Sequence, residues 1–158
     1  MKLAIGSDKS GFAVKEAIKA YLAEANIPCD DLGTLDLGDV HPYYRVAGDV
    51  APLVQNGTYE KAILICGTGA GMSVVANKFK GVHAVACESL YAAKMARAIN
   101  NANVLCMGGW IVGPEMANEM VKLFLATEWC QDLEDWRAVN MYKFAAEVAK
   151  IEDSIYGA

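Results

Sequence analysis

The stretch KAILICGTGAGMSVVANKFK, from Lys61 to Lys80, decides the fold of this chain. It begins with an apolar run, Ala62 to Ile65, which is typical of a buried parallel strand. It ends in GMSVVANKFK, which predicts a helix. A glycine-rich turn between strand and helix brings backbone N–H groups close to a ligand and aims the positive end of the helix at it. Cys66 lies at the end of the strand, so we expect its thiol beside a cluster of anion-stabilising donors.

Further strands and helices are predicted on both sides of this stretch. The other predicted strands are Lys2 to Ser7, Pro28 to Leu32, Val82 to Ala86 and Val104 to Met107. Amphipathic segments lie between them, so strands and helices alternate five times. This alternation favours a Rossmann-like, doubly wound α/β fold, with a five-stranded parallel sheet and helices on both faces. Ligands of such sheets bind at the edge where the carboxyl ends of the strands lie.

The composition narrows the class of protein. A chain of 158 residues with 54% hydrophobic content suits one domain, residues 1–158. The net charge is −5 and no basic block stands out, so we expect no nucleic-acid partner. No apolar run reaches the roughly 18 residues of a membrane span, and the first residues do not resemble a signal peptide. Five cysteines at irregular spacings, with no CxxC pair, suggest free thiols in a reducing cytoplasm and no zinc site.

One motif carries a family resemblance. Ile-Cys-Gly-Thr-Gly-Ala-Gly-Met-Ser, followed by Ala-Asn-Lys, resembles the active-site signature of the type B ribose-5-phosphate isomerases and galactose-6-phosphate isomerases. The resemblance implies an aldose–ketose isomerase that acts on a small sugar phosphate through a cis-enediolate, with neither cofactor nor metal. In that family the cysteine at the position of Cys66 is the base. Thr68 and the amides of Gly67, Gly69 and Gly71 help hold the enediolate.

The resemblance also assigns substrate-binding residues elsewhere in the chain. Asp8 matches an aspartate that contacts sugar hydroxyls, and Lys9 stands where a histidine near the phosphate is common. Asn100 matches an asparagine that binds substrate oxygens, and Glu88 keeps the acid of a His-Asp pair. Arg137 is the candidate that remains from a C-terminal group of phosphate-binding arginines. The structural alternatives are a buried core cysteine for Cys66 and helix-terminal or solvated roles for the others.

Two departures from the family pattern bear on the substrate. Ile99 stands where the family has a histidine credited with ring opening, and Trp110 stands where the family has an arginine. Loss of the histidine suggests a substrate that is already open-chain, as four-carbon sugar phosphates are. Tetrulose-phosphate isomerases of this family also lack the histidine. The reduced number of arginines raises the possibility of a different anion, or of no phosphate.

The end of the chain, residues 133–156, predicts one more helix, with large apolar side chains roughly on one side. No strand follows it, so its apolar side needs another surface, either the protein's own sheet or a partner subunit. We favour a partner, because the family is dimeric with shared active sites. We therefore expect a homodimer or tetramer in which this helix lies at the dimer interface.

Three alternatives remain at this stage. The chain is a tetrulose-4-phosphate isomerase, or a galactose-6-phosphate isomerase subunit that needs a different partner chain, or a non-catalytic sugar-phosphate-binding module. A dinucleotide-binding fold is less favoured, because the glycine spacing is G-x-G-x-G and not G-x-G-x-x-G. An acidic residue, Glu88, does follow Gly67 near the position expected for that motif.

Overall fold

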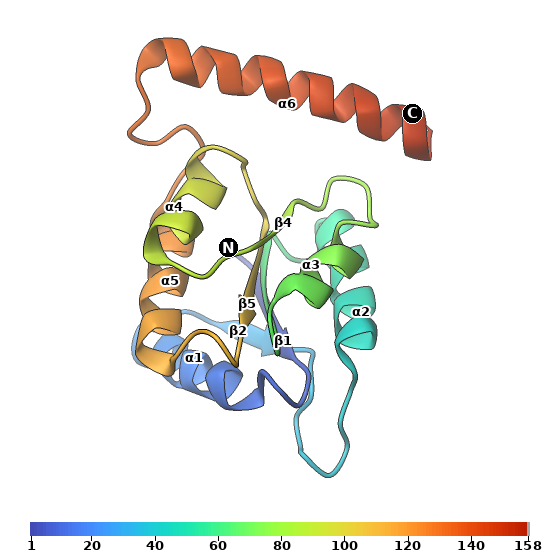
Figure 1. The fold of residues 1–158 in the computed structure, drawn as a ribbon, viewed down its shortest axis with the longest axis vertical. Coiled ribbons are helices and arrows are strands. Elements are labelled where there is room, and N and C mark those ends of the chain that lie inside the picture. Colours follow the sequence, from blue (N-terminus) through green and yellow to red (C-terminus); the bar gives the residue numbers. More distant parts are fainter. Residues whose placement is uncertain (158) are drawn as a thin grey trace.

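The computed structural model describes residues 1–157, and its strands form one parallel sheet (Figure 1). The spatial order is β2-β1-β3-β5-β4. The strands are β1 (Leu3–Ser7), β2 (Cys29–Asp31), β3 (Lys61–Cys66), β4 (Ala84–Ala86) and β5 (Val104–Gly108). The helices are α1 (Phe12–Glu24), α2 (Tyr43–Gln55), α3 (Ala70–Ala76), α4 (Leu90–Ala98), α5 (Pro114–Ala126) and α6 (Asp135–Tyr156).

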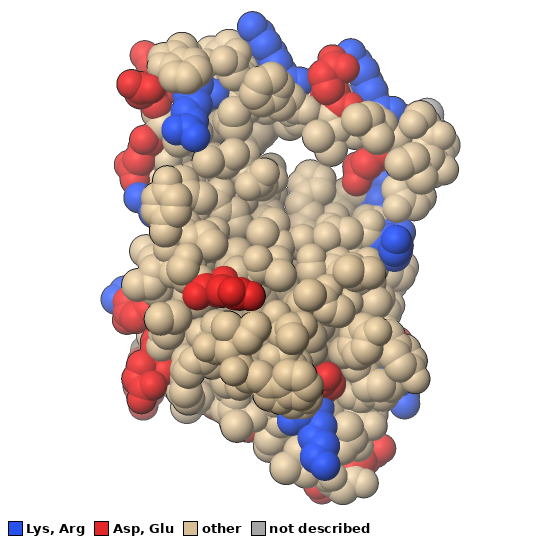
Figure 2. Space-filling view, in the orientation of Figure 1, with Lys and Arg blue, Asp and Glu red and all other residues tan. Residues whose placement is uncertain are grey.

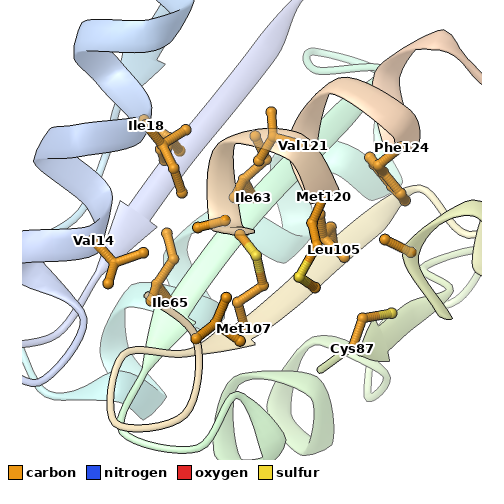
Figure 3. Packing of buried hydrophobic residues seen from close by; sticks show 14 of the residues in the cluster. Val14, Ile18, Ile63, Ile65, Cys87, Leu105, Met107, Met120, Val121 and Phe124 are labelled. Carbon is orange, nitrogen blue, oxygen red and sulfur yellow. The ribbon is translucent and has the colours of Figure 1, made fainter. Parts of the chain in front are cut away.

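Helices cover both faces of the sheet, which confirms the predicted fold class. Buried side chains of α1, α4 and α5 pack on one face, and those of α2 and α3 pack on the other. Figure 3 shows part of the first core, where Ile18 of α1 and Val121 of α5 lie near Ile63 of β3. Because both faces are covered, β5 and the part of β3 after Lys61 are apolar throughout, as the sequence indicated.

The pleat of β3 decides which way Cys66 faces. Ile63 and Ile65 point into the core beneath α1 and α5, whereas Leu64 and Cys66 point toward α2 and α3. Because α3 follows directly after the loop that begins at Cys66, this thiol lies beneath the start of the helix that its own loop introduces.

The helix α3 is shorter than the predicted segment, which extended to Lys80. It ends at Ala76, because Asn77 bonds to the neighbouring strand instead of continuing the helix. The Asn77 side chain donates to the Ala84 carbonyl oxygen at 2.8 Å and accepts from the Ala84 N–H at 2.8 Å. This pair of hydrogen bonds fixes the start of β4.

The predicted C-terminal helix is present as α6, and none of its residues is buried (Figure 1). Near its start, Trp129 contacts Tyr142 with 4.4 Å between ring centroids. Near its end, Lys80 Nζ lies 2.7 Å from Asp153 Oδ1. Between these attachments Figure 2 shows an opening under the helix, and side chains of α6, such as Phe144, line a cavity with the body there. The helix therefore bridges two points of the body without covering it.

Candidate active site

Three loops meet at the carboxyl edge of the sheet. The loop after β3 begins at Cys66 and Gly67, and the loops after β1 and β5 lie on either side of it, because β1 and β5 are the neighbours of β3. Backbone hydrogen bonds join them. The Asp8 N–H donates to Ile65 O at 3.2 Å, and the N–H groups of Gly109 and Trp110 donate to the carbonyl oxygens of Cys66 and Gly67 at 2.7 and 3.0 Å. Strand order thus brings separate parts of the sequence into one rigid edge.

Cys66 lies at the centre of this edge with only 4% of its surface exposed. Its Sγ accepts a hydrogen bond from the backbone N–H of Gly69 at 3.1 Å. Gly69 adopts a left-handed φ of 79°, and a Cβ there would lie 2.8 Å from the carbonyl carbon of Met107. The turn therefore requires glycine, and it directs an N–H group at the sulfur, where the donor stabilises developing negative charge.

Two other thiols near Cys66 have no comparable donor. Burial raises the pKa of Cys87 to about 11, and burial also raises the pKa of Cys106 well above its ordinary value. Both therefore remain neutral thiols at pH 7 and act as small apolar core residues. Among these three thiols, the hydrogen bond from the loop singles out Cys66 for chemistry.

Aromatic rings flank the glycine loop. A Cβ on Gly67 would lie 2.8 Å from two ring carbons of Trp110, and a Cβ on Gly71 would lie 2.9 Å from two ring carbons of Tyr43. Thr68, between them in sequence, is exposed. Sequence reasoning missed Tyr43. The available signal was its place in the first turn of a helix that follows a strand, because such helices start at the carboxyl edge.

The loop after β1 places Asp8 beside Cys66. Its Oδ1 accepts hydrogen bonds from the N–H groups of Ser10 and Gly11 at 2.8 and 3.1 Å. Asp8 therefore organises the start of α1. Among the described residues no hydrogen bond to Oδ2 is found, so that oxygen faces no competing donor within the chain. Lys9 is exposed.

Glu88 lies at the same edge, two residues beyond the end of β4, and it is exposed. Because β5 separates β4 from β3, Glu88 is roughly 10 Å from the Cys66 strand, at about 4.8 Å per strand spacing. One chain thus brings Asp8, Lys9, the Cys66 loop and Glu88 to one edge.

The other two predicted residues lie elsewhere. Asn100 follows α4 and lines the cavity beneath α6, at the edge where the strands begin. The length of β3, about 16 Å at 3.3 Å per residue, separates that edge from Cys66. Arg137 is exposed in the first turn of α6. A single chain therefore does not bring Asn100 or Arg137 to the Cys66 loop.

Two absences complete the description. Within residues 1–157 no group of three or more His, Cys, Asp or Glu side chains is placed to hold a metal ion. None of the helices in that range is both long and apolar enough to cross a membrane.

Comparison with known proteins identifies the family. The sequence profile described as Ribose/Galactose Isomerase matches residues 3–141. The chain belongs to this family. It is 51% identical to 4-deoxy-4-sulfo-D-erythrose isomerase of Clostridium sp. (strain MSTE9), over 99% of this chain and 98% of that protein. It is 36% identical to D-erythrulose-4-phosphate isomerase of Pectobacterium atrosepticum, over 82% of this chain and 85% of that protein.

Solved structures agree with this assignment. The ribose-5-phosphate isomerase B of Clostridium thermocellum matches with a TM-score of 0.84 and 33% identity, over 98% of this chain and 99% of that one. The sequence-based prediction of an aldose–ketose isomerase with a Rossmann-like fold is therefore confirmed.

Proposed function

We propose that this isomerase interconverts the aldose and ketose forms of a four-carbon sugar with a sulfonate on C4, of the type named by its Clostridium relative. The observation that carries the proposal is Ile99, directly before Asn100. An isoleucine cannot transfer a proton to open a sugar ring. A 4-deoxy-4-sulfo tetrose has no oxygen on C4, so it cannot close a furanose ring and needs no ring-opening group.

The charge of the site supports the same substrate. A sulfonate carries a single negative charge, whereas a phosphate monoester carries about −1.5 to −2 at pH 7. The predicted anion-binding residues of this chain are few, Lys9 and Arg137. Trp110, beside the catalytic loop, is uncharged. A small number of cations suits a monoanion better than a dianion.

The proposed mechanism uses one base and a set of fixed donors. Cys66, as thiolate, removes the proton from C2 of the aldose, and negative charge develops on the carbonyl oxygen. Thr68 and the loop amides hold this enediolate. The proton of the C2 hydroxyl group moves to the oxygen on C1, the protonated sulfur delivers its own proton to C1, and the product is the 2-ketose. Asp8, Glu88 and Asn100 orient hydroxyl groups.

We further propose that the protein works as a homodimer with shared sites. Asn100 and Arg137 lie away from the Cys66 loop of their own chain, so their predicted roles require a second copy. The apolar side chains of α6 support this arrangement, because they are exposed in one chain: Val139, Tyr142, Phe144, Val148, Ile151 and Ile155. The five free cysteines support a cytoplasmic location.

The substrate is tested by proton NMR in heavy water. The panel contains 4-deoxy-4-sulfo-erythrose, erythrulose 4-phosphate, ribose 5-phosphate and unmodified erythrulose. Deuterium should enter the carbon beside the carbonyl fastest in the sulfonate. Faster exchange in erythrulose 4-phosphate would favour the second candidate, which the Pectobacterium relative supports. Binding without exchange would indicate a non-catalytic module.

Shared sites are tested by complementation. Cys66→Ala and Asn100→Ala are each expected to be inactive as homodimers. Mixed after unfolding and refolding together, half of the dimers are heterodimers with one intact site each, so about a quarter of wild-type turnover returns. No recovery in a verified heterodimer would contradict shared sites. A wild-type protein that is inactive alone would point to a different partner chain.

A further inference from the structure

Trp110 occupies a position beside the catalytic loop that the mechanism does not yet use. Its backbone N–H donates to Gly67 O at 3.0 Å, so its backbone is joined directly to the residue after the base. The preceding Gly109 approaches the loop after β1 so closely that a Cβ would lie 2.4 Å from Ser10 O. The turn that carries Trp110 therefore contacts both of the loops that hold Cys66 and Asp8.

The indole ring lies over the glycine loop and is not part of the core. A Cβ on Gly67 would lie 2.8 Å from ring carbons Cε3 and Cζ3, so the benzene edge of the ring rests on the loop backbone. Yet 74% of the Trp110 surface is exposed. A large aromatic side chain that contacts a catalytic loop and contributes little burial is placed to contact a ligand.

The proposed substrate is short, so its charged end stays close to the carbon on which Cys66 acts. Three bonds separate C2, where Cys66 acts, from the sulfur atom on C4. The ring lies against Gly67, immediately beside Cys66 in sequence, so it borders the place where a substrate that reacts with Cys66 must bind. Among the described residues, no hydrogen bond from Trp110 Nε1 is found.

We propose that Trp110 is a specificity-determining residue that contacts the anionic end of the substrate and favours a monoanion over a dianion. The inference rests on the proposed function and names the residue that selects the substrate. The indole offers one neutral N–H donor and no positive charge. A sulfonate needs less positive charge beside it than a phosphate does, so a neutral donor at this point penalises the phosphate more.

The test compares kcat and KM for 4-deoxy-4-sulfo-erythrose and erythrulose 4-phosphate in three variants. Trp110→Arg adds a cation beside Gly67, so the ratio of phosphate to sulfonate kcat/KM should rise by about tenfold or more, mainly through the KM for phosphate. Trp110→Phe keeps the ring without the N–H, so the KM for sulfonate should rise a few-fold, with kcat unchanged. Leu35→Arg adds the same charge at an exposed loop residue that is not among the groups nearest to Gly67, Gly69 or Gly71, and it should leave the ratio unchanged.

The outcomes distinguish a failure of this inference from a failure of the proposed function. A ratio within twofold of wild type in Trp110→Arg overturns the inference, and so does an unchanged sulfonate KM in Trp110→Phe. An equal rise of the ratio in Leu35→Arg also overturns it, because long-range charge would then explain the effect. If the wild-type protein turns over neither compound, the proposed function itself fails.

Discussion

At the carboxyl edge of the sheet, backbone hydrogen bonds join three loops, whereas the 22-residue helix α6 has no buried residue. The first region is so close-packed that Gly69 and Gly109 leave no room for a Cβ. The second contacts the body mainly near its two ends, with an opening between them. The proposed base, Cys66, and its donors are therefore positioned by contacts within one chain. The helix α6 has no buried residue in one chain, and in the proposed dimer a second copy supplies further contacts.

The largest effect is expected at the carboxyl edge. Cys66→Ala removes the base, so turnover should fall by about 10²–10⁴-fold while the fold persists. Cys106→Ala is the matched control, because it deletes a fully buried thiol on the same face of the sheet and should lower stability without abolishing turnover. The measurement is aldose–ketose interconversion together with circular dichroism. Full turnover by Cys66→Ala would rule out the proposed base.

Removal of α6 tests the other region. A chain that ends at residue 133 should keep the sheet and the first five helices, because α6 has no buried residue. It should lose the dimer and nearly all turnover, because Arg137 and the proposed interface are gone. Light scattering and thermal unfolding check these two outcomes separately. A truncated chain that remains dimeric and active would show that α6 serves neither assembly nor the site.

A buried ion pair between Lys15 of α1 and Asp31 of β2 joins these two elements near the carboxyl edge of the sheet. Lys15 is completely buried, forms an ion pair with Asp31, and donates to Thr34 O at 2.7 Å in the loop after β2. Asp31→Asn leaves the buried ammonium with Glu16 as its remaining carboxylate, and should destabilise the fold by about 3 kcal/mol in urea unfolding. The control Glu119→Gln breaks an exposed pair with Lys122 and should change stability by less than about 1 kcal/mol. Equal losses of stability in the two variants would mean that the buried pair contributes no more to folding than the exposed pair.

The same carboxyl group predicts a pH dependence. Burial acts to raise the pKa of Asp31, but hydrogen bonds from Lys15 and Lys19 outweigh it and hold the pKa below its ordinary value of 3.8. The stabilisation is therefore complete above that ordinary value and is lost as the pH falls through the lower folded-state pKa. The free energy of unfolding should fall less steeply with acid in Asp31→Asn than in wild type. If the free energy of unfolding fell equally steeply with acid in both proteins, the pH dependence could not be assigned to Asp31.

The sequence predicted features that depend on local pattern. Continuous apolar runs identified the strands, because both faces of a central strand such as β3 are buried. The glycines after Cys66 indicated a tight strand-to-helix loop, because few other residues adopt a left-handed φ such as that of Gly69.

Features that depend on tertiary contacts were not predictable in this way. Nothing in the local sequence indicates that Tyr43 packs against Gly71, since the contact depends on where α2 begins relative to β3. Likewise, the separation of Asn100 from Cys66 follows from the direction of α4, which returns the chain to the opposite edge. The end of α3 was misjudged, because Asn77 pairs with Ala84 across a turn.

The smallest effect is expected where α6 ends. Lys80 and Asp153 lie 2.7 Å apart, but their side chains are 36% and 49% exposed, so Asp153→Asn should cost no more than about 1 kcal/mol. If a second copy holds α6, the amide hydrogen exchange of its last turns should change little in this variant at concentrations where the dimer persists. It should rise on dilution, and equally in wild type, as the dimer dissociates. A large rise in exchange at high concentration would instead mean that the polar contacts of its own chain hold α6, because a partner's apolar surface would not be affected by the loss of one exposed carboxylate.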